Sequence, residues 1–378
     1  MVTNIFLGLP PPNVVKWIRE EAERKHQEML KTPLSFTATE DNSSVSLVCF
    51  DRMLDGFGDS WCKLDYSMDG KSWQAYIDPD SDDETLHRGK IISLSKGETV
   101  YFKATLGDVE GNPNLNGFRS NNGLKYHCFI MEGSIEADGN IQFLLENSGT
   151  KIDVPENCYY RIFSDCGNLT KAPALPATTL ASGCYSSMFS SCISLTKAPA
   201  LPATTLAEYC YSYMFSSCTS LVQAPALPAE TLALYCYQHM FSDCTSLTQA
   251  PALPATDLDG YCYSGMFFGC TSLVQAPALP ATSLDGYCYS IMFFGCTSLT
   301  KAPDLPATAL VGYCYNSMFT YCTSLNSINI NFTSWDPSDA TLDWVTSVSS
   351  SGTFTCPTGL PEEFGNDKIP HGWTVVRK

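Results

Sequence analysis

A period of 26 residues in the middle of the chain constrains its fold more than any other feature. One series of cysteines recurs every 26 residues from Cys158 to Cys314, and a second series runs from Cys166 to Cys322. Fourteen of the 18 cysteines belong to these two series. A single unit of this size cannot bury both of its faces. The period therefore predicts seven units, stacked so that equivalent side chains form one continuous core.

Each unit carries the same pattern, which residues 210–235 illustrate: CYSYMFSSCTSLVQAPALPAETLALY. Leu206, Cys210 and Met214 are spaced by four residues, which predicts a short helical turn with one apolar face. The segment 221–227 is predicted to be extended, because Ala-Pro disfavours helix. The recurring prolines lack an N–H group, so the predicted strands are narrow, about two or three residues wide. Together these features predict an α+β repeat solenoid.

The run from Cys210 to Pro228, CYSYMFSSCTSLVQAPALP, resembles the BspA-like leucine-rich repeats of Bacteroidetes and their phages. The resemblance covers about residues 158 to 325 and implies a leucine-rich-repeat-like solenoid. Two features depart from the family pattern: a cysteine replaces the usual aliphatic residue before the aromatic pair, and the strand contains Ala-Pro. Both departures concern the width of the expected sheet.

Four regions are predicted along the chain. Residues 1–33 hold a proline run and then a helix with Asn13 as its N-cap, which serves as an anchor or oligomerisation segment or, with equal weight, folds back on the next region. Residues 34–150 alternate apolar and polar positions between turn signals, which predicts an antiparallel β-sandwich domain. Residues 151–325 form the solenoid, and residues 326–378 its C-terminal cap.

The charge balance excludes some classes of partner. The formal net charge is −17, and a chain without clustered Lys and Arg is a poor ligand for nucleic acid or for an anionic membrane. No apolar stretch has the length of a membrane span. The apolar run 5–9 is too short for a signal peptide and has no basic residue before it, so we expect synthesis in the cytoplasm without a signal peptide.

No catalytic, metal or cofactor site is predicted. The cysteines within a unit have seven residues between them, too many for a zinc site, and His239 is the only histidine in the array. Disulfides between in-register cysteines are disfavoured because their side chains point the same way, so we expect free, buried thiols. The acidic run 78–84 lacks the glycine and final acid of a calcium loop. No nucleophile, phosphate-loop or dinucleotide motif occurs.

The candidate binding surface consists of side chains at the variable positions of the units. Aromatic residues on a rigid array supply contact area at a low entropic cost. The candidate residues are Tyr213, His239, Phe268, Ile291, Phe294 and Tyr321. Two alternatives remain open: paired tyrosines that flank the first cysteine of most units, and a polar row on the strand side comprising Lys171, Lys197, Gln223, Gln249, Gln275 and Lys301.

These features favour a non-enzymatic recognition or structural protein whose partner is a host surface glycan or protein. Residues 64–76 and 92–102 also resemble N-terminal modules that precede such repeats in gut Bacteroidetes proteins and their phages. Together with the expected lack of a signal peptide, this favours a phage virion fibre or decoration component that attaches or self-associates through the N-terminal helix. The alternatives are a bacterial BspA-like cell-surface adhesin, a passive structural spacer, and an enzyme hidden in residues 34–150.

Overall fold

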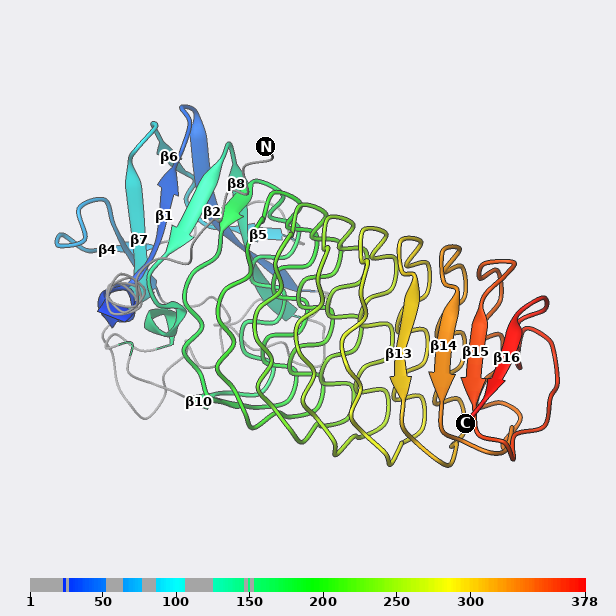
Figure 1. The fold of residues 1–378 in the computed structure, drawn as a ribbon. Helices are drawn as coiled ribbons and strands as arrows, with labels where there is room; N and C mark the ends of the chain where they lie inside the picture. The colour runs from blue at the N-terminus through cyan, green and yellow to red at the C-terminus, as the bar shows by residue number, and fades with distance from the viewer. Residues whose placement is uncertain are drawn as a thin grey trace, which may run out of the picture.

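A block of β-strands forms one end of the molecule, and a long stack of coils extends from it to the C-terminus (Figure 1). The structure is a computed structural model. It describes residues 23–24, 27–51, 64–76, 86–105, 125–145, 149 and 153–378.

Two sheets make up the β block. The first contains, in spatial order, β11 (Leu169–Lys171), β9 (Ile135–Asp138), β1 (Leu34–Ala38), β7 (Thr99–Ala104), β3 (Leu64–Ser67) and β4 (Gln74–Tyr76). The second contains β5 (Leu86–Arg88), β2 (Ser43–Asp51), β6 (Ile92–Leu94) and β8 (Lys125–Glu132). Side chains alternate between buried and partly exposed along β7, as a strand with one face on a core requires. The rings of Phe36 in β1 and Phe129 in β8 lie 4.7 Å apart, so the two sheets share a core.

The β block and the coil stack form one continuous structure. Strand β11, from the first coil, pairs in parallel with β9, so the first coil adds a strand to the first sheet. The ring of Phe129 stacks on that of Phe163 at 5.6 Å. A short 3-10 helix, η1 (Ile141–Leu144), lies buried at this junction, and the Asn140 side chain caps it. The hydrophobic core consequently runs without a break from the β block into the coils.

Columns of identical side chains fill the interior of the coils. Phenylalanines from Phe163 to Phe319 stack with ring centroids 5.4–5.9 Å apart, and an inner row of tyrosines from Tyr159 to Tyr315 stacks at 5.8–6.0 Å. Both cysteine series are fully buried. From Cys192 to Cys322, each thiol of the second series donates to the carbonyl of a phenylalanine in the preceding coil, for example Cys218 to Phe189 at 3.1 Å, and Cys166 donates to Phe129 in β8. These thiols therefore both fill space and pair buried backbone acceptors.

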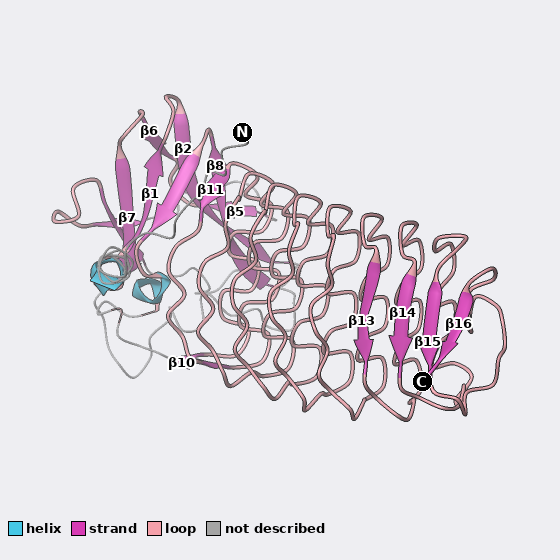
Figure 2. Ribbon diagram, in the orientation of Figure 1, coloured by secondary structure: helices cyan, strands magenta, loops and turns pink. Residues whose placement is uncertain are grey.

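The predicted α+β, leucine-rich-repeat-like fold is wrong, because the described residues are mostly β-strands and turns (Figure 2). The segments that we expected to form helical turns are runs of β-turns. Every fourth residue has a positive φ, as at Tyr209, Tyr213 and Ser217, where φ is 56–60°. Repeated left-handed residues interrupt an α-helix. Four-residue turns bury every fourth residue much as a helix does, so the apolar spacing could not distinguish the two.

Hydrogen bonds explain why turns are preferred to a helix here. Alternate N–H groups bond within their own turn, as Ser212 does to Tyr209 at 3.1 Å. The N–H groups between them bond to the next coil, as Tyr211 does to Cys236 at 3.0 Å and Tyr213 to Gln238 at 2.8 Å. A helix would use every N–H group within its own coil. The turns instead leave half of them to hold neighbouring coils together.

The N-terminal helix predicted for residues 1–33 is also not supported. Residues 23–24 and 27–29 have helical backbone. Asn13 and the apolar positions on which the prediction depended lie outside the described residues.

The opposite side of the coils is extended but forms regular strands only near the ends of the stack. β11 occupies this side at the β block, whereas β10 (Asp153–Val154) and β12 (Thr179–Leu180) pair in a separate column, which the bridge between Thr179 and Thr205 continues. The last coils contribute β13 (Lys301–Leu305), β14 (Ser327–Ile330), β15 (Thr353–Cys356) and β16 (Thr374–Arg377), which form a parallel four-stranded sheet. Three buried tryptophans close this end, each donating its indole N–H to a backbone carbonyl: Trp335, Trp344 and Trp373.

Candidate binding edge of the coil stack

The turns of the coil stack form an exposed edge that carries the candidate residues; we call it the turn edge. Five of the six candidates come from five successive coils, and their rings form one continuous row. Adjacent centroids are 4.8 Å apart for Tyr213 and His239, 6.1 Å for His239 and Phe268, 4.7 Å for Phe268 and Phe294, and 5.3 Å for Phe294 and Tyr321. We call this row the aromatic ladder.

The ladder alternates between stacked and angled contacts. The rings of Tyr213 and His239 are within 12° of parallel, and those of Phe268 and Phe294 are within 5°. The contact between His239 and Phe268 is tilted by 56°, and Tyr321 meets Phe294 at 77°. Stacked rings cover each other's faces, so ring faces are open to a ligand mainly where the stacking is broken.

The backbone at these positions is unusual for bulky residues. Tyr213, His239, Ile291 and Tyr321 all have a positive φ, between 48° and 62°. A left-handed conformation costs about 1–2 kcal/mol for a residue with a side chain, and it is rarest for a β-branched residue such as Ile291. Ile291 lies on the turn edge, partly buried, at the position equivalent to His239 two coils earlier. The structure therefore brings all six candidates to one edge, five of them in ring contact.

Gly265 allows His239 to adopt its position. Gly265 has a φ of 63° and is the equivalent of His239 in the next coil. A Cβ atom at Gly265 would lie 2.3 Å from Cε1 of His239, so the imidazole occupies the space that a side chain would need. This partial burial lowers the pKa of His239, and the carboxylate of Asp243 opposes that shift. His239 is therefore held mainly neutral at pH 7.

The paired tyrosines divide into two different rows. The outer row, from Tyr209 to Tyr313, lies on the turn edge with ring centroids only 4.3–4.6 Å apart. The inner row is buried in the core, which raises the pKa of Tyr211 and its neighbours. Only the outer row can take part in binding.

A gap beside the ladder was missed in the sequence. The position after Phe268 and Phe294 is glycine, whereas the equivalent positions in neighbouring coils are Asp243 and Tyr321. The signal is visible in the sequence: two adjacent units read MFFGC where the others read IFSDC, MFSSC, MFSDC or MFTYC. The predicted site includes the two phenylalanines but not the glycines that follow them.

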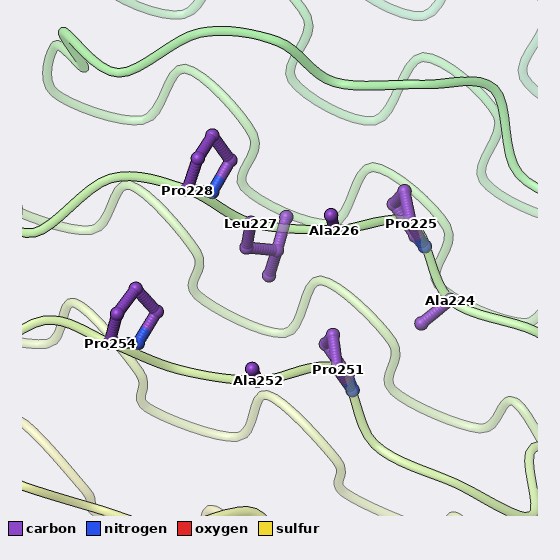
Figure 3. Close-up of a pocket in the computed structure, with 8 residues that line it drawn as sticks. All are labelled: Ala224, Pro225, Ala226, Leu227, Pro228, Pro251, Ala252 and Pro254. Atoms are coloured by element: carbon purple, nitrogen blue, oxygen red, sulfur yellow. The ribbon is translucent and has the colours of Figure 1, made fainter.

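The strand side is a weaker candidate. The polar row from Lys171 to Lys301 is exposed. Beside it, alanines and prolines of successive coils line a shallow apolar depression, as Figure 3 shows for two coils: Ala224, Pro225, Ala226, Leu227, Pro228, Pro251, Ala252 and Pro254. The depression has few polar groups to orient a ligand.

The cysteines are arranged as core residues. The sixteen cysteines whose side chains the structure describes are buried and unbridged, and burial raises the pKa of Cys210 and Cys218 to about 12. Within the described ranges, no three metal-ligating side chains come together. The acidic run 78–84 lies outside those ranges. None of the helical backbone that is described is long and apolar enough to cross a membrane.

No family model, curated protein or solved structure matches this chain. The similarity to BspA-like repeats therefore stays a prediction from the residues quoted above.

Proposed function

We propose that the protein is a non-enzymatic recognition protein that uses the turn edge of its coil stack to bind a partner. The observation that carries this proposal is the aromatic ladder. Tyr321 is 51% exposed and Tyr213 39% exposed, and five rings from consecutive coils lie on one edge. Aromatic groups held in this way are typical of binding surfaces, because burying them gains contact area without a large loss of side-chain entropy.

The backbone of the coil stack supports the same proposal. N–H groups of Tyr213, His239 and Phe268 all take part in backbone hydrogen bonds within or between coils. Residues of the ladder therefore project from a backbone that is fixed at several points in every coil. A pre-formed surface loses little free energy on ordering when a ligand binds.

The biological setting is part of the proposal and depends on the resemblance alone. A phage virion fibre or decoration component, with a glycan or protein on the host surface as its partner, is the setting we favour. A bacterial cell-surface adhesin would use the same edge. Virion structural genes beside this gene would favour the first setting, and an export signal encoded just upstream would favour the second.

Binding to host cells tests the proposal directly. Fluorescently labelled protein is titrated against intact candidate host cells, with the double variant Phe268→Ala/Phe294→Ala compared with the wild type. Removing two ladder rings should weaken binding at least about tenfold, the effect of losing about 1.4 kcal/mol of contact.

The matched control is Gln249→Ala/Gln275→Ala, which changes two exposed residues on the strand side of neighbouring coils. It should bind like the wild type. If the glutamine variant loses binding and the phenylalanine variant does not, the strand side is the binding face. If the wild type binds no candidate cells, the passive spacer replaces the recognition protein.

A further inference from the structure

Beside the aromatic ladder, two adjacent coils have no side chain at a position where every other coil has one. This column consists of Asp165, Ser191, Ser217, Asp243, Gly269, Gly295 and Tyr321, and every member has a positive φ. The two glycines leave a gap bounded by Asp243 at one end and Tyr321 at the other. Coils one ladder step apart are separated by about 4.8 Å, so these two ends are about 14 Å apart along the column. We call this gap the glycine trough.

The floor of the trough is open. A Cβ atom on Gly295 would find only backbone atoms of Gly269 within 4 Å, the nearest at 3.8 Å. A Cβ atom on Gly269 would lie 2.2 Å from Oδ1 of Asp243, so the Asp243 carboxylate reaches over the Gly269 backbone. The trough therefore combines open space at Gly295 with a carboxylate oxygen directed into it from one side.

An aromatic residue precedes each glycine of the trough in the chain. Phe268 and Phe294 immediately precede the two glycines, and their stacked rings are half-buried. Tyr321, in the next coil, meets Phe294 edge to face and is half-exposed, so part of its ring surface stays free. The trough thus offers apolar ring surface near Gly295 and one carboxylate over Gly269, in the adjacent coil.

The backbone of the floor has no N–H group to offer a peptide. The N–H of Gly269 donates to the carbonyl of Phe294 at 2.8 Å, and that of Gly295 to the carbonyl of Thr320 at 2.8 Å. An extended peptide could not pair with these groups as an added strand. Recognition must come from the aromatic rings and from the Asp243 carboxylate, which accepts hydrogen bonds from hydroxyl groups.

We infer that the glycine trough binds a neutral sugar ring of a glycan; this inference rests on the proposed recognition function and names its ligand class. The C–H face of a pyranose would lie against the Phe294 ring, and its hydroxyl groups would donate to the Asp243 carboxylate, which reaches over Gly269 in the adjacent coil. A net charge of −17 repels acidic sugars, which makes the ligand neutral.

The first test fills the floor of the trough. Gly295→Asn adds an uncharged side chain of a type that tolerates the left-handed conformation. The matched control is Ser217→Asn, in the same column three coils away. Wild type and variants are applied to a printed array of neutral, sialylated and sulfated oligosaccharides. We expect binding to neutral oligosaccharides that Gly295→Asn abolishes and Ser217→Asn leaves unchanged, with equal thermal melting of both variants showing that each is folded.

The second test removes the carboxylate. Asp243→Asn should weaken binding of the same oligosaccharides about ten- to a hundredfold, because a hydrogen bond to a charged group is replaced by a neutral one. Asp165→Asn, the same change at the far end of the column, should have no effect.

The outcomes separate this inference from the proposed function. Preference for acidic glycans, or neutral binding that Gly295→Asn does not change, overturns the sugar site. If the protein binds host cells through the ladder yet binds no oligosaccharide on the array, the partner is a protein and the recognition function stands. If it binds neither cells nor oligosaccharides, both proposals fail.

Discussion

The Ala-Pro coils, residues 184–300, and the C-terminal coils, residues 301–377, stack in the same parallel manner but are joined differently. The C-terminal coils form a ladder of four strands, β13 to β16 (Figure 2). The Ala-Pro coils make only isolated bridges on this side, such as Lys197 to Gln223 and Gln249 to Gln275. Proline explains the difference, since it has no N–H to donate to a ladder, and β14, β15 and β16 contain none. β13, which contains Pro303, is an edge strand, and its pairing with β14 shifts in register at that proline.

This difference shows where the repeats gain their cohesion. In the Ala-Pro coils the hydrogen bonds between neighbours lie mainly at the turn edge, where Tyr211, Tyr213 and Phe215 each donate to the next coil. The buried columns of phenylalanine, tyrosine, methionine and cysteine supply the rest. The edge that holds these coils together is also the edge that carries the aromatic ladder, which keeps the ladder rigid.

Alkaline pH should produce the largest difference in stability between the Ala-Pro coils and the C-terminal coils. Burial raises the pKa of thiols such as Cys210 and Cys218 to about 12, whereas an unfolded thiol ionises near 8.5. The folded state therefore keeps protons that the unfolded state releases, and stability falls as the pH rises from about 9 towards 12. For each pH unit in this range, each buried thiol lowers the free energy of unfolding by about 1.4 kcal/mol. The summed loss from several thiols exceeds the free energy of unfolding of an ordinary domain.

The C-terminal coils after Leu325 contain only Cys356, so they should resist this transition longer. Limited proteolysis under reducing conditions, mapped by mass spectrometry as the pH is raised, should show cleavage within residues 184–300 before residues 326–377. Cleavage that begins in the C-terminal coils would contradict the thiol explanation.

Proline in the C-terminal sheet should reproduce the weakness of the Ala-Pro side. Asn329 lies in the central strand β14, between β13 and β15. Asn329→Pro should lower the free energy of unfolding by about 3 kcal/mol, because it removes a donor from a paired strand. Urea denaturation measures the change. The control is Pro251→Ala, in the Ala-Pro coils, where neighbouring strands form no continuous hydrogen-bond ladder; it should change the free energy of unfolding by less than about 1 kcal/mol. Equal losses in both variants would show that proline does not cause the difference between the two regions.

Relieving the backbone at the turn edge should stabilise the Ala-Pro coils slightly. Ile291 has a φ of 48°, a conformation that glycine adopts freely and that Gly265 shows at the equivalent position. Ile291→Gly should raise the free energy of unfolding by up to about 1 kcal/mol, measured by urea denaturation. Loss of stability instead would mean that side-chain contacts of Ile291 outweigh the strain.

Acidification should have the smallest effect on the stability of the coils. The pKa of His239 is lowered by partial burial, so the folded state favours the neutral ring. Stability contributed by neutral His239 is present above the unfolded pKa near 6.5 and is lost as the pH falls through the lower folded value. The melting temperature should therefore fall slightly between about pH 7 and pH 5, and less so in His239→Gln. An identical fall in both proteins would assign the effect to other groups.

The candidate site was predictable in part. The six candidates are at variable positions, and variability within a strict period marks residues that the shared core does not need. Their contacts were not predictable, because the tilt of His239 towards Phe268 depends on the missing side chain at Gly265. The trough at Gly269 and Gly295 was missed for a similar reason: a glycine is visible as a gap only once its neighbours are in place.

The 26-residue period by itself determined that equivalent cysteines, tyrosines and leucines would form columns, because identical units gain a core only by covering one another. Only the tertiary structure decided that the first half of each unit is a run of turns. Helices and four-residue turns give the same apolar spacing at Cys210 and Met214, so the pattern could not choose between them. The choice was made by neighbouring coils, which accept the N–H groups that a helix would have used within itself.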